Sequence, residues 1–334
     1  MLQTLQRKNL AVIAIDHPIH GSRALAGGAI STTDNALYYL NLSALPVARD
    51  NIRQSVLDVI GLRMALSLPS NNFTGTPLAG VTLSNDSIKF LGHSLGGITG
   101  LTSVATAQKV GAFGFKSAAY PNAGGHIAEL LFASKKSLVL RSNIISLRNL
   151  MPTTKTSVAD VCAANNIGDV DCYNGFAAAS PSSAAKLEAE LVSFKVAAQT
   201  LVDTVDPHSM VNASGYFDAG NTYPTLLLQV DGDETVPNNG LADDGVTPLS
   251  YTASFVGTEG LGNSLSLTEL NEATRTTTGS RLFAKFGSAG THSTFIVPKS
   301  DLSDVAQIQA MRTLIGDFLA NDESTAAVAS GVLE

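Results

Sequence analysis

The sequence predicts an α/β protein, with a mostly parallel, doubly wound sheet and helices on both of its faces. Three observations support this fold class. Short, almost continuously apolar runs recur along the chain, as in parallel strands buried on both faces. Segments with helical spacing of apolar residues separate several of these runs. The chain has 334 residues, of which 44% are hydrophobic and 15% charged, so residues 1–334 are sufficient for a single large domain.

Five apolar runs are the predicted strands of this sheet. They cover residues 10–15, 88–91, 112–119, 225–230 and 281–286. Four of the five lead into loops rich in Gly, Asp, Asn or His, and the fifth run ends at Asp16. Because the carboxyl ends of parallel strands meet at one edge of a sheet, these loops are expected to lie close together.

Helical patterns lie between and after the strands. One covers residues 51–63, with Asp50 as its expected N-cap, and the chain closes with an amphipathic helix over about 302–319. A third, built from small residues, begins at Ile98. Residues 127–205 contain helical patterns and no convincing strand, which predicts a helical cap inserted into the single domain.

The two cysteines of the chain, Cys162 and Cys172, both fall within this insertion. A disulfide between them would close a loop of 11 residues, with a stabilisation of about 3 kcal/mol on the chain-entropy estimate. Such a bond indicates an oxidising compartment. The alternative is two unrelated buried thiols. No His or Cys cluster surrounds them, so neither a metal nor another cofactor is expected.

Charge and hydropathy exclude two classes of partner. The formal charge is −7, and no basic stretch offers a footprint for nucleic acid. No run approaches the roughly 20 apolar residues that span a bilayer, so stable membrane insertion is not expected. The first residues also lack the pattern of a secretory signal peptide. The oligomeric state stays open.

The motif Gly92-His93-Ser94-Leu95-Gly96 follows one predicted strand and opens a helix. A Gly-x-Ser-x-Gly sequence in this setting is typical of a nucleophile elbow, in which a sharp turn projects the serine hydroxyl above the sheet. Ser94 is therefore the candidate nucleophile, and the Leu95 N–H is a candidate oxyanion donor. The alternative is a glycine-rich turn in which Ser94 merely caps the helix.

A serine hydroxyl needs a base, and the order Ser, Asp or Glu, His selects His292. Asp233 lies in the loop after the strand at 225–230 and is the candidate acid that orients the imidazole, with Asp231 as the alternative. His292 could instead be a solvated loop residue. His93 is expected to face away from the nucleophile and to serve in packing.

With these residues in place, the chain resembles the bacterial extracellular lipases and lysophospholipases of the α/β-hydrolase superfamily, which include surface-exposed lipoprotein lipases. The resemblance rests on residues 14–21, 50–55, 92–97, 233–237 and 290–293. It implies hydrolysis of acyl esters, the triad named above, no metal, and a secreted or cell-surface location.

The chain departs from this family at its start. In such hydrolases a strand ending in a His-Gly-type loop precedes the strand expected here at 10–15, and that loop donates a second oxyanion N–H. No such segment precedes residue 10, so the N-terminal strands are either missing by truncation or replaced. In the second case the strands at 10–15 and 88–91 would pair directly, and His17 would supply the second N–H beside Ser94.

The function expected from the sequence is that of a serine carboxylester hydrolase, an esterase or lipase acting through a Ser94 acyl-enzyme. Its substrate would be a small-molecule or lipid ester. Two alternatives remain. One is a thioesterase or polyester hydrolase with the same triad, and the other is a hydrolase-fold module that binds without catalysis.

Overall fold

The computed structural model describes the chain with several internal gaps. The described residues are 1–35, 38–41, 44–68, 73–77, 79–80, 84–134, 161–162, 164–167, 169–214, 223–241, 246, 248 and 252–334.

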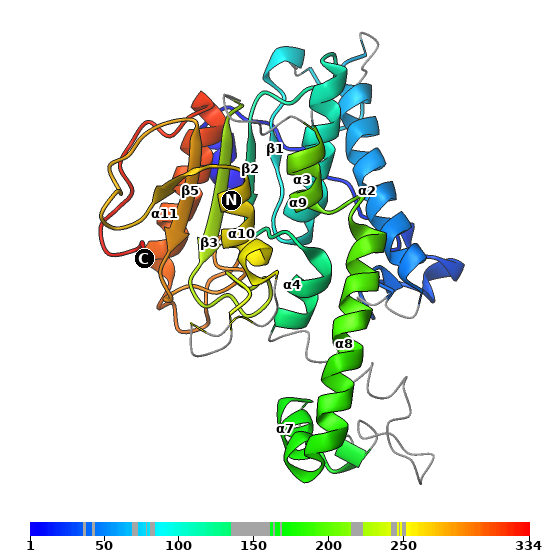
Figure 1. Cartoon of the computed structure of the whole chain (residues 1–334). Coiled ribbons are helices and arrows are strands. Elements are labelled where there is room, and N and C mark those ends of the chain that lie inside the picture. The colour runs from blue at the N-terminus through cyan, green and yellow to red at the C-terminus, as the bar shows by residue number, and fades with distance from the viewer. Residues whose placement is uncertain are drawn as a thin grey trace.

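The protein is an α/β protein built on a parallel sheet of five strands in the order β1-β2-β3-β5-β4 (Figure 1). The strands are β1 (Phe90–Leu91), β2 (Ala118–Pro121), β3 (Thr225–Val230), β4 (Thr268–Leu270) and β5 (Arg281–Phe286). The central pair, β3 and β5, matches the predicted runs residue for residue. Each residue of β3 is buried, as a strand covered on both faces requires.

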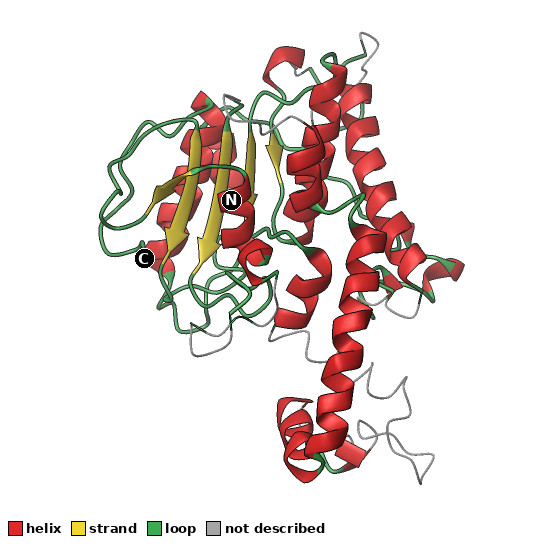
Figure 2. Ribbon diagram, in the orientation of Figure 1, coloured by secondary structure: helices red, strands yellow, loops and turns green. Residues whose placement is uncertain are grey.

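Helices cover both faces of the sheet, as Figure 2 shows. Alternate residues of β3 point to opposite sides. Leu226 and Leu228 pack in one cluster with α11 (Val305–Asn321), whereas Leu227 packs in another with α3 (Leu95–Val110) and α10 (Gly257–Ser264). The predicted layered arrangement of strands and helices is therefore present.

The other helices complete these layers. They are α1 (Leu2–Arg7), α2 (Leu45–Leu66), α4 (Ile127–Ala133), α7 (Asp169–Ala179), α8 (Pro181–Val202) and α9 (Pro207–Ser214), with 3₁₀ turns at Gly21–Arg23, Ala26–Gly28, Asn85–Ser87 and Ala253–Phe255. The described residues of segment 127–205 are helices and their connections. None of the described helices is long and apolar enough to cross a membrane.

The prediction that Asp50 caps the helix over 51–63 was wrong. Helix α2 begins at Leu45, after Ala44, and carries a proline in its first turn. Proline fixes a helical φ and lacks an N–H that would need a partner there, so it starts a helix well. Asp50 is instead an exposed residue inside α2 that pairs with Arg49 and Arg53.

The predicted strand at residues 10–15 does not form. Residues 11–15 make no backbone hydrogen bond with any described residue, and Val12, Ile13 and Ile15 are exposed. The strand β1, expected to be their partner, pairs only with β2 and so lies at the edge of the described sheet. An apolar run becomes a strand only where a neighbour pairs with it.

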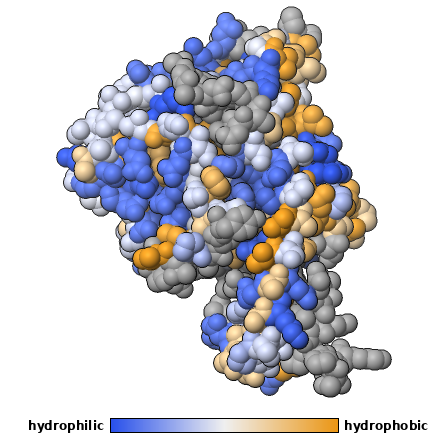
Figure 3. Space-filling model, viewed as in Figure 1, coloured by the Kyte–Doolittle hydropathy of each residue, from blue (hydrophilic) through white to orange (hydrophobic). Residues whose placement is uncertain are grey.

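Apolar surface also lies over α2 on the face shown in Figure 3.

Two further strands have other boundaries than predicted, and one strand was not predicted. The run at 88–91 contributes only Phe90–Leu91, and the run at 112–119 contributes only its last two residues to β2, which extends to Pro121. Strand β4 was missed because two of its three residues are exposed and carry no apolar pattern.

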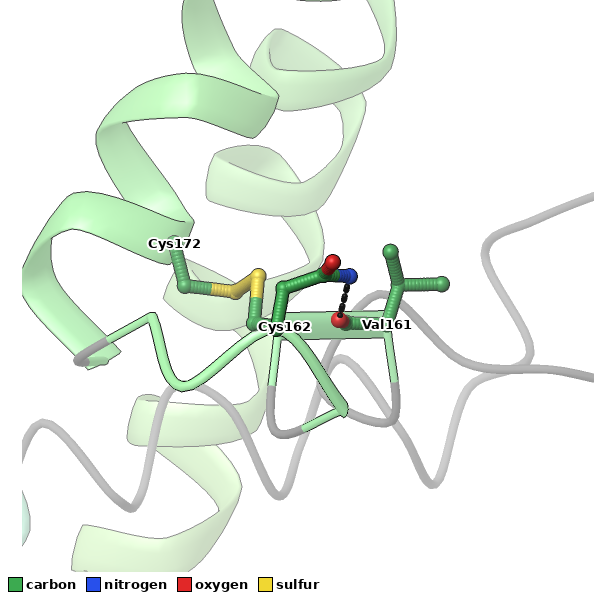
Figure 4. The surroundings of a disulfide bond; sticks show 4 residues. Val161, Cys162 and Cys172 are labelled. Carbon is green, nitrogen blue, oxygen red and sulfur yellow. Dashed lines mark hydrogen bonds between the residues drawn. A yellow bond between two sulfur atoms is a disulfide. The ribbon is translucent and has the colours of Figure 1, made fainter.

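The lower part of α8, together with α7, projects away from the sheet in Figure 1. A separate apolar cluster holds these helices together and includes Phe176, Leu187 and Leu191. Cys162 and Cys172 belong to the same cluster, and the disulfide predicted between them is present (Figure 4). The bond therefore stabilises the projecting helices locally.

Removing this disulfide is expected to open the projecting helices without unfolding the sheet. The chain-entropy estimate of about 3 kcal/mol corresponds to about a 100-fold rise in locally open molecules. In the double variant Cys162→Ser/Cys172→Ser, limited proteolysis followed by mass spectrometry should show cleavage within 161–191 accelerated by up to about that factor. Equal cleavage rates in the variant and the parent protein would contradict the local role of the bond.

Candidate active site

The chain turns sharply from β1 into α3 at Ser94. The backbone of Ser94 has φ 54° and ψ −123°, a strained conformation for a residue with a side chain. Its N–H donates to the Pro121 carbonyl at the end of β2, which fixes the turn against the sheet. Strain held by surrounding contacts is a recurrent feature of functional turns.

Two glycines allow the strand and helix to approach closely at this turn. A Cβ on Gly92 would lie 2.3 Å from the Gly96 carbonyl oxygen, and one on Gly97 would lie 2.6 Å from the Cβ of Ala123. Gly96, the second glycine of the motif, has no such neighbour. Gly92 and Gly97 are therefore required for packing, and the positive φ is carried by Ser94 itself.

The Leu95 N–H is the first of α3 and has no hydrogen-bond partner among the described residues. An N–H at a helix start points out of the helix along the positive end of its dipole. It is therefore free to donate to an oxygen beside Ser94, as the oxyanion prediction requires.

The structure brings His292 and Asp233 into direct contact. His292 Nδ1 lies 2.6 Å from Asp233 Oδ2. Asp233 follows β3 and His292 follows β5, and these strands are adjacent in the sheet. The contact leaves Nε2 of the imidazole as the nitrogen that can act on another group.

Asp233 is held rigidly. Its side chain is 1% exposed, and Oδ1 accepts the N–H groups of Thr235 and Val236 at 2.8 and 3.1 Å. Asp231 and Glu234, which the sequence places in the same turn, are exposed. Of the three carboxylates only Asp233 is oriented by the backbone toward His292.

Ser94 has no side-chain hydrogen bond to any described residue, so the last link, from Ser94 Oγ to His292, is open. The two residues are nevertheless neighbours through His93, whose ring centroid lies 4.7 Å from that of His292. Catalytic hydrogen bonds are often long before substrate binds. The described contacts therefore pair His292 with Asp233 and leave the link from Ser94 to His292 unformed.

The route by which His17 was expected to reach Ser94 is wrong, because strand 10–15 and its pairing with β1 do not form. Nδ1 of His17 lies 2.8 Å from the Ser55 hydroxyl on α2, and its ring packs edge-on against Tyr39. Burial lowers the pKa of His17. Its role as second oxyanion donor stays a prediction.

Two further residues contact the backbone of His292. His93 Nε2 lies 2.8 Å from the His292 carbonyl oxygen, and Asn122 Nδ2 lies 2.6 Å from the same atom. His93 was expected to face away and to pack; it packs, but against His292. Asn122 was overlooked, although a polar residue in the loop after a buried strand was the signal that could have found it.

The described residues offer no site for a metal ion. No three side chains of His, Cys, Asp or Glu among them gather closely enough to coordinate one.

Comparison with known proteins finds one informative local similarity and no matching family model. A segment of 67 residues is 45% identical to part of an extracellular lipase of Aeromonas hydrophila. That segment is 20% of this chain, and the match spans 9% of the lipase's own length. The chain is thus similar over a short stretch to part of an extracellular lipase.

Proposed function

We propose that this protein is a serine carboxylester hydrolase of the α/β-hydrolase fold, with Ser94 as nucleophile, His292 as base and Asp233 as orienting acid. The observation that carries the proposal is the 2.6 Å contact from His292 to a buried Asp233, beside a strained turn that bears Ser94. The local similarity to an extracellular lipase supports ester chemistry.

In the proposed reaction the Ser94 oxygen attacks the acyl carbon while His292 Nε2 takes the hydroxyl proton. The ionised Asp233 stabilises the imidazolium without accepting that proton. The Leu95 N–H donates to the negative oxygen of the tetrahedral intermediate. His292 then protonates the departing alcohol, and a water deprotonated by His292 releases the acid from Ser94.

We also propose that the acyl chain of the substrate binds at a small apolar pocket near the turn, whose volume of about 20 Å³ must widen to admit the chain. Its lining is entirely apolar and comes from α2, α4, α8 and the segment before α2; it includes Leu40, Ile52, Ile127 and Ala198. Ile52 and Ile127 share a cluster with Leu95 and Ile98, the residues one and four positions after Ser94. The pocket therefore lies close to the first turn of α3.

The chain-length dependence of p-nitrophenyl esters tests this part of the proposal. Burial of each CH₂ contributes about 0.8 kcal/mol, so kcat/KM is expected to rise from acetate to butyrate by roughly tenfold. Longer esters, up to palmitate, then report where the pocket ends. A steady fall from acetate onward would show that the acyl chain lies elsewhere, even if ester cleavage itself is observed.

The Ser94 hydroxyl makes no hydrogen bond to His292, and this favours a second candidate, a hydrolase-fold module that binds without catalysis. A fluorophosphonate distinguishes the two, because it reacts only with a serine that a base activates. A thioesterase with the same triad is distinguished by comparing kcat/KM for acyl-CoA and oxygen esters of equal chain length.

We also propose a secreted or cell-surface location. The disulfide between Cys162 and Cys172 favours an oxidising compartment, and the similar lipase is extracellular.

A further inference from the structure

One backbone oxygen, the carbonyl of His292, is contacted from two separate elements. His93, in the turn after β1, approaches it through Nε2 at 2.8 Å, and Asn122, in the turn after β2, through Nδ2 at 2.6 Å. A carbonyl oxygen can only accept, and it has two lone pairs. Both of its acceptor positions are therefore filled by side-chain donors.

The donors have defined chemical forms. Because the partner is an acceptor, the His93 tautomer must carry its hydrogen on Nε2, and the Asn122 amide must present its NH₂ group. Burial and the neighbouring His292 lower the pKa of His93 to about 4. The ring is therefore neutral near pH 7 and adds no positive charge beside His292.

Both donors are themselves immobilised. The His93 ring lies between the ring of His292, at 4.7 Å, and that of Phe295, at 5.0 Å. Asn122 is completely buried with φ 52°, and its N–H donates to the Leu228 carbonyl of β3. Asparagine is one of the few residues that adopt this conformation at small cost.

The base lies in a loop, where turns rather than a strand or helix set its position. Thr291 N–H donates to Thr294 Oγ1, which in turn donates to buried Asp304. These contacts attach the loop to Asp304, which precedes α11. The bond from His93 joins this loop to the turn carrying Ser94, and the bond from Asn122 joins it to the turn after β2, where the Pro121 carbonyl accepts the Ser94 N–H.

We propose that His93 and Asn122 are positioning residues that fix the main chain of His292 relative to Ser94. The proposal rests on the proposed function, since it concerns the spacing between nucleophile and base. A displacement of about 1 Å in such a pair lowers turnover by about 100-fold. His93 is covalently adjacent to Ser94, so its bond sets that spacing directly.

The test compares His93→Phe, which keeps a ring between His292 and Phe295 but cannot donate, with His93→Gln, which can donate through its amide. With p-nitrophenyl butyrate, His93→Phe is expected to lower kcat by about 10- to 100-fold, with KM unchanged within about twofold. His93→Gln is expected to recover most of the lost kcat. Thermal unfolding of each variant reports whether the fold is retained.

Asn122→Asp provides an independent variant of nearly the same shape. It replaces a donor with an oxygen facing the His292 carbonyl, so kcat should fall at least as far as in His93→Phe. If His93→Phe and Asn122→Asp both retain parental kcat, the positioning role is refuted while ester hydrolysis stands. If His93→Phe is fully active and His93→Gln is not, the ring serves packing alone. An inert parent protein that no fluorophosphonate labels would instead refute the proposed function itself.

Discussion

Ser94→Ala is expected to abolish ester hydrolysis. The variant removes the atom that forms the acyl-enzyme, and loss of the serine from a Ser-His-Asp unit lowers kcat by about 10⁶-fold. The fold should survive, because the hydroxyl makes no hydrogen bond to any described residue that its loss would break. The measurement is kcat for p-nitrophenyl butyrate, with a thermal unfolding curve beside it.

Ser87→Ala is the matched control. Ser87 is exposed, lies seven residues before Ser94, and its hydroxyl donates only to the carbonyl of Ser84 at the same 3₁₀ turn. The control should keep the parental kcat within about twofold, since exposed surface substitutions rarely disturb a distant site. Substantial activity in Ser94→Ala would show that another residue is the nucleophile.

Asp233→Asn is expected to lower kcat by about 10⁴-fold while the side chain keeps its shape. The amide can present its NH₂ group to His292 Nδ1, which favours the tautomer with its hydrogen on Nε2. That nitrogen can then no longer accept the serine proton. We expect this loss of kcat to be large because Asp233 Oδ2 lies only 2.6 Å from His292 Nδ1.

Asp231→Asn and Glu234→Gln are the controls for Asp233→Asn. Both carboxylates lie in the same turn, carry the same charge and are exposed. Each control should keep kcat within about twofold, because exposed charges are screened by solvent. A loss in Asp231→Asn comparable to that in Asp233→Asn would mean that the turn as a whole, rather than one carboxylate, supports the base.

The two longest strands of the sheet were predictable from the sequence. Residues 225–230 and 281–286 were predicted to the residue, because β3 and β5 pair with each other at the centre of the fold. The run at 10–15 has the same apolar pattern and forms no strand. Hydrophobic pattern reports the tendency to be buried, and it carries no information about whether a partner strand is present.

The catalytic candidates were predictable for a different reason. Ser94, Asp233 and His292 each follow a strand of the same parallel sheet, and the carboxyl ends of parallel strands lie at one edge of a sheet. The contacts of His93 and Asn122 were not predictable, because their acceptor is a main-chain carbonyl. Every residue has such a group, so it leaves no trace in the sequence.

The most direct test of the central claim is the site and rate of fluorophosphonate labelling, followed by intact-mass and peptide mass spectrometry. The parent protein should incorporate one label per chain, located on Ser94, and His292→Ala should slow the reaction by several orders of magnitude. Label on another residue, or an equal rate in His292→Ala, would show that the imidazole at 292 does not activate the hydroxyl at 94.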